Sequence, residues 1–181
     1  MIVSLILGMG LPTPVAYIIV ALALVPFMQQ IGIPPLQAHF FVFYFAVFST
    51  LTPPVAVSVL AAAKLGEATF LSTAKDAMKI ALTTFIIPFA FVFSPELMLF
   101  PNVTWGTMLA VVEVVFVQLA VSVASYGFLI RSLNGFERGV YAFVALSGFL
   151  GFTYDANFWY VAVALFMTIS GYVFVSNKTQ E

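Results

Sequence analysis

The sequence contains no cysteine and very little charge. Without cysteine, disulfide bonds and thiolate metal sites are excluded. Charged residues make up only 7% of the 181 residues, whereas hydrophobic residues make up 63% and the mean hydropathy is +1.14. A soluble domain carries about 25% charged residues, so this chain cannot cover a water-facing surface. We therefore expect an integral membrane protein, and no basic block points to nucleic acid as a partner.

The sequence also lacks the residue patterns of an active site. It has one histidine, His39, and no paired carboxylates, no Ser/His set and no metal-ligand spacing. An intramembrane enzyme that used Glu113 and His39 would have to work without any of these, so we expect no enzymatic activity. A carboxylate at bilayer depth usually faces protein or water, so Glu113 suits an ion relay or, more simply, a hydrogen-bonded residue between helices. His39 is expected to be a polar anchor at the base of a hairpin rather than a substrate contact.

Apolar runs long enough to cross a bilayer follow one another along the chain, which predicts an all-α polytopic membrane protein. The expected helical segments are 1–9, 14–30, 36–64, about 80–100, 104–130 and 139–175. The first segment is too short to span alone, which suits one arm of a re-entrant hairpin. The last one is long enough for two helices broken near 151–157, and a single helix is the alternative.

The expected organisation has three parts. Residues 1–65 form a transport-domain half with a re-entrant hairpin and an unwound transmembrane helix, and residues 80–181 form the C-terminal transmembrane helices. Between them, 66–79 alternates charged and apolar residues. This pattern fits an amphipathic helix on the cytoplasmic membrane surface and equally fits the solvated start of the next helix.

The basic residues orient the chain in the membrane. If 139–175 is two helices, all of them fall on one side: Lys64, Lys75, Lys79, Arg131, Arg138 and Lys178. The positive-inside rule makes this side cytoplasmic, so the C-terminus is cytoplasmic and the 1–30 hairpin enters from outside. Trp105, Trp159 and Tyr160 then fall near the outer interface, where aromatic belts lie.

Two stretches place glycine, proline and hydroxyl residues inside runs that would otherwise form continuous membrane helices. They are Gly8-Met-Gly-Leu-Pro-Thr-Pro14 and Ser49-Thr-Leu-Thr-Pro-Pro-Val55. Proline removes a backbone donor and clashes with the preceding turn, so nearby carbonyls lose their helical partners. In hydrocarbon such carbonyls must be satisfied by protein, water or a bound ion. Paired interruptions of this kind indicate the midplane binding site of a secondary transporter, and an ordinary structural proline kink is the alternative.

The residue types in both stretches fit a hard cation such as Na⁺, which takes oxygen ligands. Freed carbonyls together with the hydroxyls of Thr13 and of the second stretch supply uncharged oxygens. Helix N-termini expected after Pro14 and Pro54 would point positive dipole ends inward, which suits an anionic substrate.

Two longer motifs carry a family resemblance. Leu7-Gly-Met-Gly-Leu-Pro-Thr-Pro-Val-Ala-Tyr17 and Ala38-His-Phe-Phe-Val-Phe-Tyr-Phe-Ala-Val-Phe-Ser-Thr-Leu-Thr-Pro-Pro-Val-Ala56 resemble the large membrane subunit, or permease, of TRAP transporters. The nearest resemblance is to fused permeases that work with TAXI-type solute-binding proteins. It covers roughly residues 1–100, and the last 80 residues carry no motif that matches.

The resemblance implies an elevator-type secondary transporter built from inverted repeats, each with a re-entrant hairpin and an unwound helix. It also implies Na⁺ as the coupling ion, no other cofactor, and import of a small organic acid. The acid would be delivered by an extracytoplasmic solute-binding protein, in the inner membrane of a bacterium or archaeon.

The resemblance also assigns the site residue by residue. The Na⁺ site, mostly of backbone carbonyls, comprises Gly8, Gly10, Thr13, Ser49, Thr52 and Pro53. The substrate positions are Pro12, Thr13 and Pro54.

No second copy of the hairpin occurs in residues 80–181. We therefore expect the chain to be the C-terminal portion of a permease, with an N-terminal half on the same or a separate chain. The alternative is a membrane structural or assembly subunit, or a fragment with no transport of its own.

Overall fold

The computed structural model describes residues 1–98 and 103–178 and divides into two compact units, before and after Met98, each of which is treated by itself. The described residues form helices and no β-strand. Four helical stretches are long and apolar enough to cross a membrane: Thr13–Gln30, Phe70–Phe93, Trp105–Tyr126 and Asn157–Asn177. The prediction of an all-α polytopic membrane protein is therefore confirmed.

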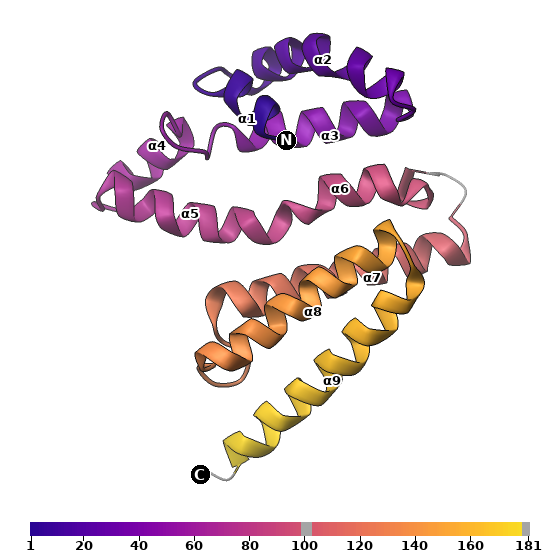
Figure 1. Cartoon of the computed structure of the whole chain (residues 1–181). Coiled ribbons are helices and arrows are strands. Elements are labelled where there is room, and N and C mark those ends of the chain that lie inside the picture. Colours follow the sequence, from indigo (N-terminus) through magenta and orange to yellow (C-terminus); the bar gives the residue numbers. More distant parts are fainter. Residues whose placement is uncertain (99–102, 179–181) are drawn as a thin grey trace. The chain divides into compact units, whose positions relative to one another are not determined.

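The first unit contains six α-helices and one short 3₁₀ helix (Figure 1). They are α1 (Ile2–Gly8), α2 (Thr13–Gln30), α3 (Pro35–Phe48), α4 (Val57–Leu65), α5 (Phe70–Thr84), α6 (Ile86–Phe93) and η1 (Pro95–Met98). Prolines mark two of the helix starts: Pro14 lies in the first turn of α2 and Pro35 begins α3. Proline is favoured there because its missing N–H has no intrahelical partner at that position.

Aromatic packing of α3 against α6 builds the core of the first unit. Phe41 and Phe45 are buried, and the Phe45 ring meets Phe85 and Phe89 edge to face at centroid distances of 5.7 and 6.0 Å. Such pairs stabilise beyond the area they bury, by about 0.5–1.5 kcal/mol each. α1 and α2 pack on the same helix α3, which fixes the α1–α2 hairpin beside the end of α3.

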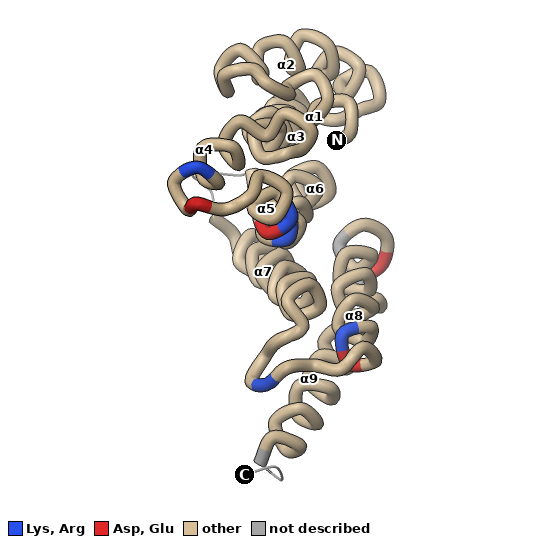
Figure 2. The backbone as a smooth tube through the Cα atoms, turned by 90° about the vertical axis from the view of Figure 1, so that its left-hand side faces the viewer, with Lys and Arg blue, Asp and Glu red and all other residues tan. Residues whose placement is uncertain are grey.

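No charged residue occurs before Lys64, and Figure 2 shows α1, α2 and α3 without charge. The first charges of α5 are Lys75, Asp76 and Lys79. α5 has no break after Lys79 and runs on to Thr84, with helical Phe85 leading into α6. The polar residues from Phe70 to Lys79 and the apolar residues up to Thr84 thus belong to one helix. α6 ends at Phe93, short of the predicted residue 100, because Ser94 precedes Pro95 and the residue before proline avoids helical geometry.

The second unit is a bundle of three helices, α7 (Trp105–Tyr126), α8 (Gly135–Thr153) and α9 (Ala156–Lys178). Neighbours in the chain pack side by side, α7 on α8 and α8 on α9 (Figure 1). Of the two alternatives for 139–175, the structure has two helices, with the break at Tyr154 and Asp155. α7 ends at Tyr126, before the predicted residue 130, because Gly127 has a left-handed φ of 66° and caps the helix.

Candidate functional site

The hairpin tip is the turn between α1 and α2. α1 ends at Gly8 and α2 begins at Thr13, close to the predicted arms. The Leu11 N–H donates to the Gly8 carbonyl at 3.3 Å, and Gly10 has a φ of 75°, which only glycine adopts without strain. The tip is therefore a tight reversal that presents backbone rather than side chains.

The second predicted interruption is also present. α3 stops at Phe48, α4 starts at Val57, and the intervening chain is not helical. It begins with one tight turn, in which the Thr52 N–H donates to the Ser49 carbonyl at 3.3 Å, and Ala56 adopts a left-handed φ of 39° before α4. α4 thus starts three residues after Pro54 rather than directly after it, because the chain must pass through the left-handed residue first.

The two interruptions meet. A Cβ atom added to Gly8 would lie 2.5 Å from the Oγ and 2.9 Å from the Cβ of Ser49, so the tip backbone is in direct contact with that side chain. A Cβ atom on Gly10 would lie 3.2 Å from a methyl group of Val55. Two segments about forty residues apart therefore form one structure, and both contacts require glycine on the tip side.

Hydroxyl groups of the interrupted segment bond backward to the end of α3. Ser49 Oγ donates to the Ala46 carbonyl at 2.6 Å, and Thr52 Oγ1 donates to the Phe48 carbonyl at 2.9 Å. Thr50 does the same to Val47 at 2.9 Å. Each hydroxyl uses its only proton in this bond, so the lone pairs of its oxygen stay available to a cation.

Backbone oxygens gather at the same place. The carbonyl groups of residues 51–55 accept no hydrogen bond from the described part of the chain, and neither do those of residues 9–11. In a membrane such carbonyls need a partner. Ser49 is fully buried, Thr52 is half-buried, and Pro53 and Pro54 are exposed, so the segment runs from the protein interior to an open face.

The other predicted residues lie nearby but are less tightly joined. Pro12 caps α2, and Thr13 is its first residue, half-buried, with no hydrogen bond from its hydroxyl to the described residues. Gly8 and Gly10 contact the interrupted segment at Ser49 and Val55. Val55 was not predicted as a contact, because its apolar side chain gives no signal of a site in the sequence.

His39 joins α2 to α3. Its Nδ1 lies 2.8 Å from the hydroxyl oxygen of Tyr17, and a pocket of about 360 Å³ opens beside the pair, lined also by Leu36, Phe40 and Phe43. The histidine is half-buried, and Tyr17 stands one helical turn after Thr13 at the tip. His39 therefore has a polar partner, but this partner lies near the tip rather than at the base of the hairpin and was not predicted.

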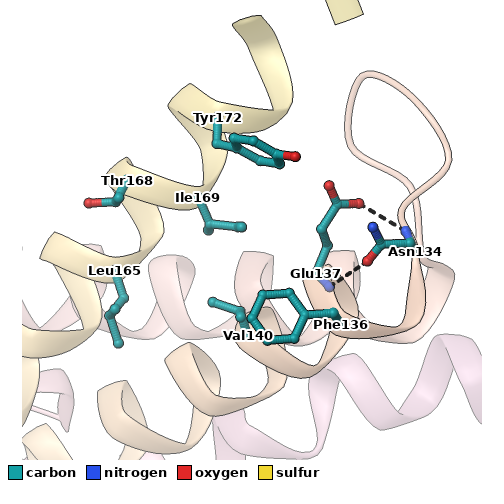
Figure 3. Close-up of a pocket in the computed structure, with 8 residues that line it drawn as sticks. All are labelled: Asn134, Phe136, Glu137, Val140, Leu165, Thr168, Ile169 and Tyr172. Carbon is teal, nitrogen blue, oxygen red and sulfur yellow. Dashed lines mark hydrogen bonds between the residues drawn. The ribbon is translucent and has the colours of Figure 1, made fainter. Parts of the chain in front are cut away.

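A partly buried ion pair lies in the second unit and was not predicted either. Arg131, in the loop before α8, makes two hydrogen bonds to the Glu137 carboxylate, at 2.6 and 3.1 Å. Glu137 is 1% exposed and also accepts the Asn134 N–H at 2.9 Å (Figure 3). The Glu137 hydrogen bonds raise the pKa of Arg131 above its usual value. Charged residues near a loop are usually exposed to solvent, so the sequence gave no indication that Glu137 is buried.

Glu137 lines a pocket of about 380 Å³ between α8 and α9, whose other walls are mainly apolar (Figure 3). The pocket offers little new chemistry, since the carboxylate is already neutralised by Arg131. Glu113 is half-buried on α7, a position that fits the relay and the structural role equally. Among the described residues, no three His, Asp or Glu side chains are grouped to hold a metal ion. A cation at the tip would therefore be held by uncharged oxygens.

The sequence of the first unit matches a known protein family. A model of the tripartite ATP-independent periplasmic transporter, DctM component, matches residues 1–106, which is more than half of the chain and includes both interruptions. The chain belongs to this family. It is a TRAP permease component, an integral membrane protein of a transporter rather than of an enzyme family. No curated protein and no solved structure matches the chain.

Proposed function

We propose that this TRAP permease component supplies the Na⁺ site and one wall of the substrate cavity of a Na⁺-coupled importer of small organic acids. The observation that carries the proposal is the contact of Gly8 with Ser49, which joins two interruptions rich in unpaired oxygens. The ion ligands proposed are carbonyls of Gly8, Gly10 and Pro53 together with the hydroxyls of Thr13, Ser49 and Thr52.

The coupling mechanism rests on ligands that come from separate segments of the chain. Gly8 and Gly10 contact the interrupted segment, and the carbonyl oxygens of Gly10 and Pro53 belong to backbone outside the helices. A bound cation would draw both segments together and so order the start of α2. The N-terminus of α2, with Pro12 and Thr13, would then face the substrate carboxylate with its positive dipole end. Dissociation of the ion on the cytoplasmic side would let the two segments separate again and would release the substrate.

The family supports a solute-binding protein as a partner, and the other partners are part of the proposal. An extracytoplasmic solute-binding protein delivers the acid, and a second hairpin with its own unwound helix, on the same or another chain, completes the cavity. Whether the delivering protein is of the TAXI type is part of the proposal. The membrane proposed is the cytoplasmic membrane of a bacterium or archaeon, with the C-terminus inside.

Transport in vesicles tests the proposal. The transporter that contains this chain is reconstituted with its solute-binding protein, and uptake of labelled organic acids is measured with an inward gradient of Na⁺ or of K⁺. We expect uptake only with Na⁺ and only with the binding protein. Equal uptake in both gradients would refute Na⁺ coupling. If the complete assembly carries no acid in either gradient, the chain is a structural or assembly subunit instead.

A further inference from the structure

A groove on the first unit combines an apolar floor with two lysines. It has a volume of about 420 Å³ and is lined by Pro53 and by one face of α5: Leu71, Ala74, Lys75, Met78, Lys79 and Leu82. Pro53 belongs to the interrupted segment, so the groove lies directly beside the candidate ion site. The α5 residues recur every three or four positions and therefore form one stripe along the helix.

The two lysines give this stripe its charge. Lys75 and Lys79 are four residues apart, on the same side of α5, and both are exposed. Within residues 1–98 and 103–178, the one ion pair present is that of Arg131 with Glu137, so neither lysine is paired with a described residue. Asp76 lies on α5 between them in sequence but does not line the groove. The two lysines therefore place positive charge beside the middle of the groove, and no carboxylate is among its lining residues.

The position of the lysines matches the edge of a membrane. The candidate span Phe70–Phe93 contains no charge after Lys79, and its last fourteen residues rise about 21 Å, most of the hydrocarbon thickness. Lys75 and Lys79 thus fall near the level of lipid headgroups, and long lysine side chains extend toward that level. Met78 and Leu82 continue the groove toward the bilayer interior.

We propose that this groove binds one anionic phospholipid. Its phosphate lies between Lys75 and Lys79, and an acyl chain lies along Met78 and Leu82 against Pro53. An apolar floor alone would accept any lipid; the two unpaired lysines select an anionic headgroup. Because Pro53 forms one wall, the bound chain restrains the segment that carries Ser49 and Thr52.

The absence of native cysteine allows a direct test. Met78→Cys gives a unique labelling position in the groove, and a bimane label there is quenched by brominated acyl chains. The complete chain is reconstituted in phosphatidylcholine with small, equal fractions of brominated phosphatidylglycerol or brominated phosphatidylcholine. Each lysine near the membrane surface raises the affinity for anionic lipid by a factor of about five. We therefore expect an apparent affinity about ten to thirty times higher for phosphatidylglycerol than for phosphatidylcholine.

Matched variants distinguish lipid binding in the groove from a general electrostatic attraction between anionic lipid and the basic residues of the protein. Lys75→Gln with Lys79→Gln should bring the affinity ratio to about one, whereas Lys64→Gln, on α4 outside the groove, should leave it unchanged. Leu119 is an exposed residue of α7, outside the first unit. A bimane label at Leu119→Cys should be quenched equally by brominated phosphatidylglycerol and brominated phosphatidylcholine. A ratio near one at position 78, or an equal loss with Lys64→Gln, would overturn the proposal. Native mass spectrometry of the unlabelled chain, with phosphatidylglycerol retained by the original protein and lost by the double variant, excludes an effect of the label.

Discussion

A missing side chain at Gly8 sets how closely the hairpin tip approaches the interrupted helix. The Oγ and Cβ of Ser49 occupy the space where a Cβ of residue 8 would stand. Ser49 cannot turn aside, since it is fully buried and its hydroxyl is bonded to the Ala46 carbonyl. The contact is therefore intolerant of even one methyl group.

Gly8→Ala is expected to destabilise the first unit by about 1–3 kcal/mol, the usual effect of overpacking. Thermal unfolding of the purified chain in detergent measures it. Gly171→Ala on α9, where nothing lies within 4 Å, is the control and should be neutral or stabilising by up to about 1 kcal/mol. Adding Ser49→Gly to Gly8→Ala removes both clashing atoms and should restore part of the loss. A Gly8→Ala variant as stable as Gly171→Ala would show that the contact is absent.

The sequence located both helix interruptions, after Gly8 and after Phe48, because glycine and proline inside an apolar run interrupt the membrane helix that the run would otherwise form. It could not predict Val55 or the hydrogen bond of Tyr17 to His39. Both depend on how α1, α2 and α3 fold back on one another, and nothing in local periodicity records which residues of two helices meet.

Glycines of α8 set its distance from both neighbouring helices. A Cβ on Gly151 would lie 2.9 Å from the backbone nitrogen of Trp159 on α9, and one on Gly148 would lie 2.7 Å from a methyl group of Val117 on α7. Helices α8 and α9 approach closely enough for the Tyr141 hydroxyl to bond Ser170 at 2.8 Å. In a membrane, where lipid is as apolar as the side chains, such close packing holds helices together.

Gly151→Ala is therefore expected to push the start of α9 away from α8, while Gly139→Ala, also on α8 but with nothing within 4 Å, should not. The readout is the fluorescence of Trp159 in a Trp105→Phe background, where it is the sole tryptophan. Gly151→Ala should lower its anisotropy and shift its emission relative to the Gly139→Ala control. Identical spectra for the two variants would contradict the close packing of α8 on α9.

The helix breaks were predictable and the helix continuity was not. Proline and glycine marked the ends of α1 and α2 and the start of α3 closely. In contrast, the polar residues of 66–79 and the apolar ones after Ile80 share the same helical period, and no breaker separates them. The pattern could not decide whether one helix or two cover this region.

At the scale of the whole molecule, charge and aromatic residues are separated within the second unit. Arg131 and Arg138 lie where α7 gives way to α8, and Trp159 and Tyr160 lie where α8 gives way to α9. Because each helix packs on its chain neighbour, these turns lie at opposite ends of the bundle. The positive-inside rule then favours the arginine end as cytoplasmic.

Single cysteines test this orientation. Ser132→Cys lies at the arginine end of the bundle and Tyr154→Cys at the tryptophan end. The Tyr154 side chain is 83% exposed, so a cysteine there is accessible to a reagent. In intact cells, a membrane-impermeant maleimide should label position 154 and not position 132. After the cells are opened, both should react. Labelling of position 132 from outside would reverse the proposed topology.

The central claim is that the hairpin tip and the interrupted helix hold one Na⁺ ion, and a Na⁺ titration of uptake with Thr52→Ala tests it most directly. The matched control is Thr168→Ala on α9, since Thr168 makes the same backward bond, to Ala164 at 2.8 Å, as Thr52 makes to Phe48. Loss of one ligand oxygen should raise the Na⁺ concentration for half-maximal uptake roughly tenfold in Thr52→Ala, with Thr168→Ala unchanged. An unchanged Na⁺ dependence in Thr52→Ala, or an equal shift in both variants, would contradict this claim.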